Sequence, residues 1–263
     1  MSAPIWPLVA AVVAGLDSPA LPRSVAALLR HVAPFSYAVM FAYQGTNPPL
    51  DVYDDFPPNK RKILVTDYQA GPYLLDPFFL AATQPVAAGL YRLRDLAPDR
   101  FYQGEYYRNY YAQTGLAEEI AYFVDLPGKA ILVLSLMRAE KPFTQREYRA
   151  LQALFPFVAA IAARHWAGLS QQFRTDQRPK AAGRQRRAIA HGLGRFSDGI
   201  LTPREREVAE FTLQGHSAES TGQILGIAAG TVRIHRRNIY SKLNINSQGE
   251  LFSRFLGTLV DAS

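Results

Sequence analysis

Apolar positions along the chain follow two kinds of spacing, and the pattern changes near residue 200. In residues 1–169, stretches with helical spacing alternate with short runs of aromatic and β-branched residues that are typical of strands. After residue 200 the apolar positions have helical spacing only. The pattern predicts a domain of mixed helices and strands followed by a small all-helical domain.

The first 169 residues contain alternating strand and helix candidates. Four runs have strand composition: Phe35–Tyr43, Leu50–Phe56, Glu119–Leu126 and Ala130–Met137. Helices are expected over residues 4–16, 22–32, 59–80, 99–114 and 143–169, with interruptions near Gly71 and Pro156. The last two strands should form an antiparallel pair across Pro127-Gly128, which predicts an α/β sandwich.

Helix start and stop signals divide residues 201–263 into short helices. Thr202-Pro203-Arg204-Glu205 has capping-box spacing with proline at the first helical position, and Gly215 can end that helix. Ser217 can cap a second helix, which Gly226 ends. Ser247 has a glutamate three residues later and opens the last helix. The signals therefore predict four helices.

The third of these helices has an apolar stripe and a separate basic face. Val232 and Ile239 are seven residues apart on the stripe, whereas Arg233 and Arg237 are four apart on another face, with Ile234 beside them. A basic third helix in a run of short helices is the form of a helix-turn-helix DNA reader. Arginine suits base recognition because its fork meets guanine O6 and N7 together.

Residues 201–254 resemble the LuxR-type four-helix DNA-binding domain. The matching motifs are Leu-Thr-x-Arg-Glu, Leu-Gly-Ile and Thr-Val-x-x-His…Ile-Tyr-x-Lys-Leu, which begin at residues 201, 225 and 231. In that family the third helix enters the major groove and the fourth helps to pair protomers. The resemblance implies a homodimeric transcription regulator on a double-stranded DNA operator, with RNA polymerase as a candidate partner and no enzymatic activity.

The resemblance also implies which side chains contact DNA. Arg233, Ile234 and Arg237 match positions that face base edges. The remaining expected contacts, at phosphate or beside it, are Thr231, Arg236, Tyr240 and Lys242. Gln248 stands where an arginine is expected before the fourth helix. Two further departures from the family pattern concern helix stability: Ala228 stands where a serine usually caps the third helix, and Gly222 lies inside the second helix. Both departures predict a less stable DNA domain.

Tyrosines are concentrated in the first domain. Eleven of the 14 lie within residues 43–122. Tyr106 and Tyr110, and likewise Tyr107 and Tyr111, are four residues apart on adjacent helix faces, so one pair can face inward while the other covers the surface. Tyrosine suits an apolar ligand pocket that has a few polar anchors. An ordinary aromatic core or a dimer surface would have the same composition.

Asp76 and Glu119 are candidate polar anchors in this aromatic region. Asp76 stands in Tyr-Leu-Leu-Asp-Pro, which resembles the Asp-Pro of quorum-sensing LuxR-type receptors, where the aspartate accepts a hydrogen bond from a ligand amide. Helix capping before Pro77 is the alternative for Asp76, and exposure to solvent is the alternative for Glu119. A buried carboxylate needs a hydrogen-bonding partner, so we expect an effector that bears an amine or amide. The expected ligand contacts are Tyr73, Asp76, Tyr107, Tyr110 and Glu119.

Composition narrows the remaining choices. The chain has no cysteine, its five histidines have no metal-ligand spacing, and its only tryptophans, Trp6 and Trp166, lie outside the aromatic region. No metal or cofactor is expected, and an acyl-homoserine lactone is not the expected ligand. The apolar stretch at residues 4–16 is too short to span a bilayer, which indicates a cytoplasmic protein.

Most of the net charge of +7 lies between the two domains. Residues 170–200 carry seven basic and two acidic side chains and little apolar periodicity. They are interpreted as a flexible linker that either adds nonspecific phosphate contacts or serves only as a tether. The predicted organisation is a GAF/PAS-like sensor at 1–169, this linker, and the reader at 201–263. The alternative is a purely structural or dimerising first domain that binds no ligand.

Overall fold

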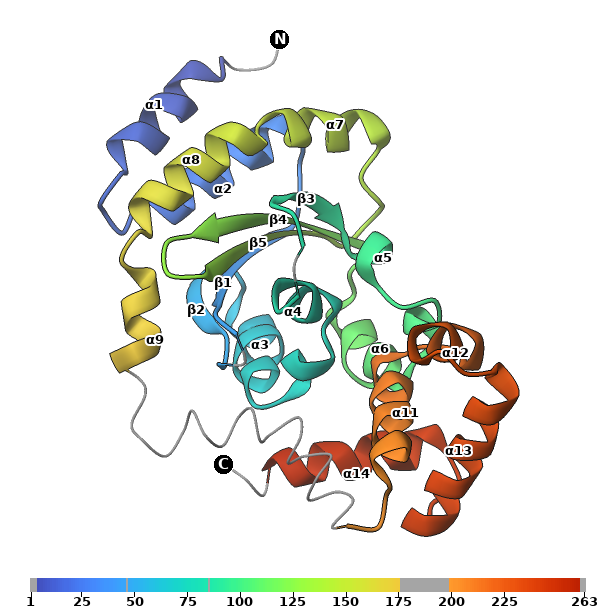
Figure 1. Ribbon diagram of the computed structural model, residues 1–263. Coiled ribbons are helices and arrows are strands. Elements are labelled where there is room, and N and C mark those ends of the chain that lie inside the picture. The colour runs from blue at the N-terminus through green and yellow to red at the C-terminus, as the bar shows by residue number, and fades with distance from the viewer. Residues whose placement is uncertain (1–3, 46, 85, 176–198, 261–263) are drawn as a thin grey trace.

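The computed structural model describes residues 4–45, 47–84, 86–175 and 199–260. A five-stranded antiparallel sheet with the order β2-β1-β5-β4-β3 forms the centre of the first domain (Figure 1). Its strands are β1 (Tyr37–Tyr43), β2 (Leu50–Asp54), β3 (Gly89–Arg92), β4 (Glu118–Leu126) and β5 (Ala130–Arg138). The prediction of an α/β domain followed by a helical domain is confirmed.

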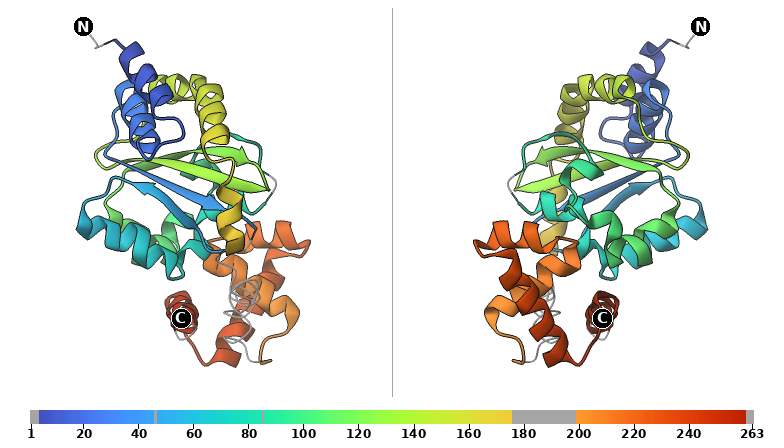
Figure 2. Two further views of the ribbon diagram at one scale, coloured as in Figure 1. Left: turned by 90° about the vertical axis from the view of Figure 1, so that its left-hand side faces the viewer. Right: turned by 90° about the vertical axis from the view of Figure 1, so that its right-hand side faces the viewer.

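Helices cover both faces of the sheet (Figure 2). One face, called here the α2 face, is covered by α1 (Trp6–Ala14), α2 (Leu21–Val32), α7 (Gln145–Ala153) and α8 (Phe155–His165). The other, called the α6 face, is covered by the short elements α3 (Pro58–Arg61), η1 (Lys62–Asp67), η2 (Pro72–Leu75), α4 (Pro77–Ala82), α5 (Leu93–Leu96), η3 (Phe101–Gln103), α6 (Glu105–Asn109) and η4 (Tyr111–Thr114).

Strand alternation sends successive side chains of β4 into two different cores. Ile120 and Tyr122 pack on the α2 face, whereas Ala121 and Phe123 pack on the α6 face. The register pairs β4 with β5 from Glu118↔Arg138 to Leu126↔Ala130, so the predicted hairpin across Pro127-Gly128 is present. Two neighbouring residues at the start of β4 therefore face different surroundings.

Two predicted helices are broken into pieces. Instead of one helix over residues 99–114, the structure has η3, α6 and η4, because the backbone leaves helical geometry at Gly104 and at Tyr110 (φ −124°, ψ −66°). In the helix predicted for residues 143–169, the interruption expected near Pro156 is present at Leu154, and Pro156 lies in the first turn of α8, where its missing N–H costs nothing. Strand β3 and helix α5 were not predicted from the sequence.

The polypeptide remains folded for a few residues beyond the predicted boundary at 169. Helices η5 (Leu169–Gln171) and α9 (Gln172–Thr175) follow α8, and Phe173 is buried in the core of the α2 face. The rest of the predicted linker, residues 176–198, lies outside the described residues. The proposed domain boundaries remain predictions.

The second domain consists of α11 (Pro203–Gln214), α12 (Ala218–Leu225), α13 (Ala229–Leu243) and α14 (Gln248–Val260). Thr202 and Glu205 form the predicted capping box of α11, and Ser217 caps α12. Gly215 and Gly226 end these helices in the left-handed region, with φ of 97° and 66°. Local sequence signals therefore account for each turn of the helix-turn-helix.

The structure explains one of the two departures from the family pattern that concern helix stability. A Cβ atom at Gly222 would lie only 2.6 Å from the carbonyl oxygen of Ile227, so glycine allows α12 to approach the turn that follows it. Ala228 precedes α13 without any side-chain cap, as predicted.

Candidate DNA interface and effector site

The outer face of α13 combines free cationic and apolar groups. Val232, Ile239 and Leu243 are buried on the inner face. On the outer face Ile234 is 49% exposed, and no described carboxylate lies within 4.0 Å of the exposed Arg237. An unpaired arginine beside an apolar side chain is suited to a guanine edge and a thymine methyl group.

The other two arginines and the lysine of α13 have partners inside the domain. Arg236 donates from Nε to Thr212 Oγ1 (2.9 Å) and from Nη2 to the carbonyl of His216 (2.7 Å). Lys242 Nζ lies 2.7 Å from the carboxylate of Glu205 on α11. Arg233 forms a surface ion pair with Glu219 on α12. These contacts hold α13 against its neighbours, so Arg237 is the basic side chain most available to DNA.

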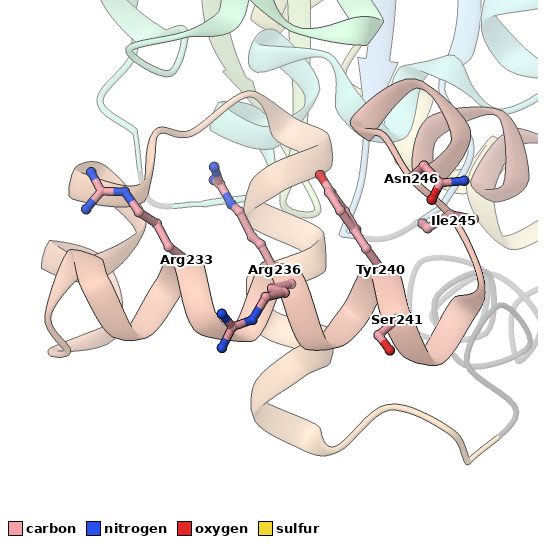
Figure 3. A pocket seen from close by; sticks show the side chains of 7 residues that line it. Arg233, Arg236, Tyr240, Ser241, Ile245 and Asn246 are labelled. Carbon is pink, nitrogen blue, oxygen red and sulfur yellow. The ribbon is translucent and has the colours of Figure 1, made fainter.

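An open groove runs beside α13 (Figure 3). Its volume is about 570 Å³, and it is lined by Arg233, Arg236, Arg237, Tyr240, Ser241, Ile245 and Asn246. Thr231 lies exposed in the first turn of α13, and Tyr240 is half-buried. Three arginines around one groove make it electropositive, which is the charge that a phosphate backbone requires.

Asp76 lies at the start of α4, where it has two roles. Its Oδ1 accepts from the backbone N–H of Phe78 (2.9 Å), which is the capping role considered from the sequence. Its Oδ2 accepts from the hydroxyl of Tyr68 (2.6 Å), and the Tyr68 hydroxyl lies 2.9 Å from that of Tyr43. Burial raises the pKa of Asp76 to about 6, against the lowering effect of these hydrogen bonds.

Glu119 points into the α6 face and is 6% exposed, so the alternative of a solvated residue is wrong. Its Oε2 accepts from the hydroxyl of Tyr111 (3.1 Å), and Ser135 of β5 also donates to the carboxylate. Burial, followed by the negative charge of Asp76, raises the pKa of Glu119 to about 8. No described lysine, arginine or histidine lies within 4.0 Å of Glu119 or Asp76.

Five tyrosines surround these two acids and are called here the tyrosine cluster: Tyr43, Tyr68, Tyr106, Tyr110 and Tyr111. Their rings are close to one another, with centroids 6.4 Å apart for Tyr68 and Tyr110 and 5.4 Å apart for Tyr106 and Tyr110. The pKa of every member is raised by burial first and then by the nearby acids.

The structure brings together some of the predicted ligand residues and not others. Tyr73 is buried beside Tyr68, with ring centroids 6.1 Å apart, and Tyr110 donates to the carbonyl of Ile63. Tyr107 instead packs on Phe101 and Tyr111. The two tyrosine pairs do not divide into an inner and an outer pair, because the helix ends at Asn109. Tyr106 and Tyr111 are buried, whereas Tyr107 and Tyr110 are half-buried.

The direct partners of the two acids lie outside the expected set of ligand contacts. Tyr68 bonds Asp76 and Tyr111 bonds Glu119, yet neither was among the expected ligand contacts. Tyr68 lies eight residues before Asp76. Only the irregular backbone between them, which no spacing rule describes, brings the two side chains together.

The reader contacts the α6 face through a junction formed by Asp99, Phe101, Gly215 and Ser217. Asp99 Oδ1 accepts from the backbone N–H of Ser217 (2.9 Å) at the start of α12, and the N–H of Arg100 donates to Gly215 (3.1 Å). A Cβ atom at Gly215 would lie 3.1 Å from the Cα of Phe101. The buried Phe101 ring also packs on Tyr106 and Tyr111, so the tyrosine cluster continues directly to the reader.

No three His, Asp or Glu side chains among the described residues are arranged to hold a metal ion. No helix in the same part of the chain is long and apolar enough to cross a membrane.

The fold and the α13 surface define a class of protein: a DNA-binding transcription regulator with a separate N-terminal α/β domain. Residues 199–255 match the family described as bacterial regulatory proteins, luxR family. An HTH-type transcriptional regulator in the exeN 3′ region of Aeromonas salmonicida is 32% identical over 189 residues, which are 71% of this chain and 96% of that protein. The chain therefore belongs to the luxR family.

Two other similar proteins extend the comparison to the first domain. The monoamine regulon transcriptional regulator of Klebsiella aerogenes is 24% identical over 229 residues, 86% of each chain. The crystal structure of the VqsR LBD domain from Pseudomonas aeruginosa superimposes with a TM-score of 0.54 and 27% identity, and the match covers 61% of this chain and 94% of that domain. The α/β domain of this chain thus has the fold of that domain.

Proposed function

We propose that the first domain binds a small molecule and thereby controls the DNA reader, with a sensor at residues 1–169, a linker at 170–200 and the reader at 201–263. The observation that carries the proposal is the pair of acids in the tyrosine cluster. Asp76 and Glu119 lie in an aromatic core without a cationic partner among the described residues, which is costly unless a ligand supplies one.

The similar proteins support the same function. The VqsR domain is termed an LBD, a ligand-binding domain, and shares the fold. The Klebsiella relative is named for a monoamine regulon, which supports an effector that bears an amine or an amide. The helix-covered antiparallel sheet also supports assigning the domain to the GAF/PAS-like class.

The junction gives a physical route for control. A ligand that changes the position of Tyr111 would act on Phe101, which touches Gly215 at the end of α11. A ligand shifts the equilibrium between two arrangements of the reader only by the difference in its affinity for them. Two readers in a homodimer would then match, or fail to match, two half-sites about one helical turn apart. The protein would act in the cytoplasm together with RNA polymerase.

Ligand control can be tested on the native, full-length protein. Mass spectrometry of the purified protein should reveal a bound small molecule, and its removal should change affinity for an operator selected from random DNA. Asp76→Asn should abolish that response and leave the unliganded fold in place. A protein that holds no molecule, and whose operator affinity responds to none, would instead have the structural or dimerising first domain.

We propose that Arg233, Ile234 and Arg237 contact base edges, and that Arg237 contributes most to the preference for the operator sequence. Arg237→Ala should weaken the selected operator by about 1–3 kcal/mol and relax preference at one base position. The matched control is Arg149→Ala, an exposed arginine on α7 at the far end of the molecule (Figure 1). Equal weakening on operator and random DNA would mean that Arg237 only contacts phosphate.

A further inference from the structure

Three acidic residues are buried within the described ranges, and two of them have a cation beside them. Glu118 lies 2.5 Å from Arg92, and Glu205 lies 2.7 Å from Lys242. Glu119 is the third, and its partners are the hydroxyl groups of Tyr111 and Ser135. A hydroxyl can donate one hydrogen bond but cannot balance a full charge in an apolar core.

Asp76 repeats the same arrangement a short way across the tyrosine cluster. Its oxygens accept from Tyr68 and from a backbone N–H, and no cation of the described residues reaches it. The two acids repel each other, since the charge of Asp76 is one cause that disfavours ionisation of Glu119. Two acids in one aromatic core therefore both lack a positively charged partner among the described residues.

The surrounding rings suit a cation as well. Tyr106 and Tyr110 pack with their ring centroids 5.4 Å apart, and each is near enough to both acids to feel their charge. The faces of aromatic rings attract an ammonium group, most strongly where water is excluded. Rings of this kind also pack against the hydrocarbon part of an amine.

Irregular backbone lies on the more exposed side of the tyrosine cluster. Asp76 and Tyr110 are half-buried, whereas Glu119 is buried. The Tyr110 hydroxyl donates to the carbonyl of Ile63 (2.6 Å) within η1, which is a π-helix. Such turns are rare and often occur at functional sites. Tyr110 is thus a side chain whose movement would open the cluster from the η1 side.

We propose that Asp76 and Glu119 together bind the ammonium group of a protonated monoamine, with Glu119 selecting the amine over the corresponding neutral amide. The inference rests on the proposed ligand-sensing function and names the charge of the ligand. An amide N–H can satisfy Asp76 alone. Only a cation offers each of the two acids a charge-assisted hydrogen bond.

The test uses the full-length protein and matched pairs of ligands. A panel of primary monoamines, aliphatic ones and 2-phenylethylamine among them, is compared with the N-acetyl derivative of each amine by thermal denaturation at pH 7.5. At about one hundred times Kd, an amine should raise Tm by roughly 5–10 °C, and its N-acetyl derivative should not. Glu119→Gln and Asp76→Asn should each lose the shift. Asp125→Asn, which alters an exposed acid on the same strand as Glu119, should keep it.

The outcomes separate this inference from the function on which it rests. If the N-acetyl derivatives stabilise the protein as much as the amines do, or if Glu119→Gln keeps the shift, the cationic site is wrong while ligand sensing stands. If no amine shifts Tm but the native protein releases a neutral molecule, the cationic site is again wrong and ligand sensing stands. If the protein neither responds to the panel nor holds any molecule, the inference and the sensing function both fail.

Discussion

Glu118 and Glu119 are neighbours on β4, and the sheet places them in opposite surroundings. On the α2 face, Glu118 accepts from Arg92 and from the backbone N–H of Phe143, both at 2.5 Å, and Arg92 also lies over the ring of Tyr148. On the α6 face, Glu119 accepts from hydroxyl groups only. One glutamate has its countercharge within the fold, and the other does not.

This difference shows which face is suited to binding. A buried ion pair whose hydrogen bonds are all made gains nothing from a ligand, because a ligand group would have to displace an existing hydrogen bond. A buried acid with weak partners can gain from a ligand. The α6 face also carries the junction to the reader. Glu119 is linked to it through Tyr111, which donates to Glu119 and packs on the ring of Phe101, and the backbone of Phe101 lies beside Gly215.

The largest expected effect concerns pH and Glu119. An unfolded glutamate loses its proton near its usual pKa of 4.5, whereas the folded value is about 8. Between these values the unfolded state binds fewer protons, so Glu119 lowers stability as pH rises, and the loss is complete above about 8. A difference of this size corresponds to roughly 5 kcal/mol. In urea titrations, the free energy of unfolding of Glu119→Gln relative to the wild type should therefore increase by about this amount as the pH rises from 4.5 to 8.5.

The corresponding change on the other face should have the opposite sign. Glu118→Gln leaves the buried guanidinium of Arg92 without its countercharge and should lower the free energy of unfolding by about 3–5 kcal/mol at pH 7. Amines should not restore the lost stability. A loss below about 1 kcal/mol in denaturant titration would show that the two faces do not differ as described.

The junction should connect only the α6 face to DNA binding. Asp99→Ala removes an acceptor from the first turn of α12 and should cost about 0.5–2 kcal/mol of stability, as loss of a helix cap does. It should also reduce the change in operator affinity that the effector causes. Asp125→Ala is the matched control on β4. An unaltered effector response in Asp99→Ala would remove the junction from the mechanism.

The smallest expected effects come from one hydroxyl group on each face. Tyr122→Phe leaves the carbonyl of Leu151 without its donor and should cost about 1 kcal/mol at any pH. Tyr111→Phe removes a hydrogen bond that favours the charged form of Glu119, so the pKa of Glu119 should rise further. A pH-independent loss in Tyr111→Phe would contradict this assignment.

Local signals in the sequence predicted the reader well and the sensor only in outline. The capping box at Thr202 and the left-handed glycines act within a few residues, so spacing alone locates them. The four longest strands were also recognisable from composition. The linker arginines Arg184, Arg186 and Arg187 lie outside the described residues, and their phosphate contacts remain a prediction.

The partners of the acids could not be predicted, because they depend on tertiary packing. Sequence alternation implies that Glu118 and Glu119 face opposite ways, but not that Arg92 lies on one side. Tyr68 reaches Asp76 only through the turn at Gly71, where φ is 156°, and the 3-10 helix η2 that follows it. Irregular backbone of this kind follows from contacts between distant segments rather than from local propensity.

The protonation state of the two glutamates is the most direct test. Infrared difference spectra between wild type and each variant, with the protein free of ligand at pH 7, report the C=O stretch of a protonated carboxyl group. The spectrum should contain such a band, which disappears in Glu119→Gln, persists in a less stable but folded Glu118→Gln, and fades in the wild type as the pH passes about 8. A wild-type spectrum in which Glu119→Gln removes no protonated carboxyl band would contradict the account.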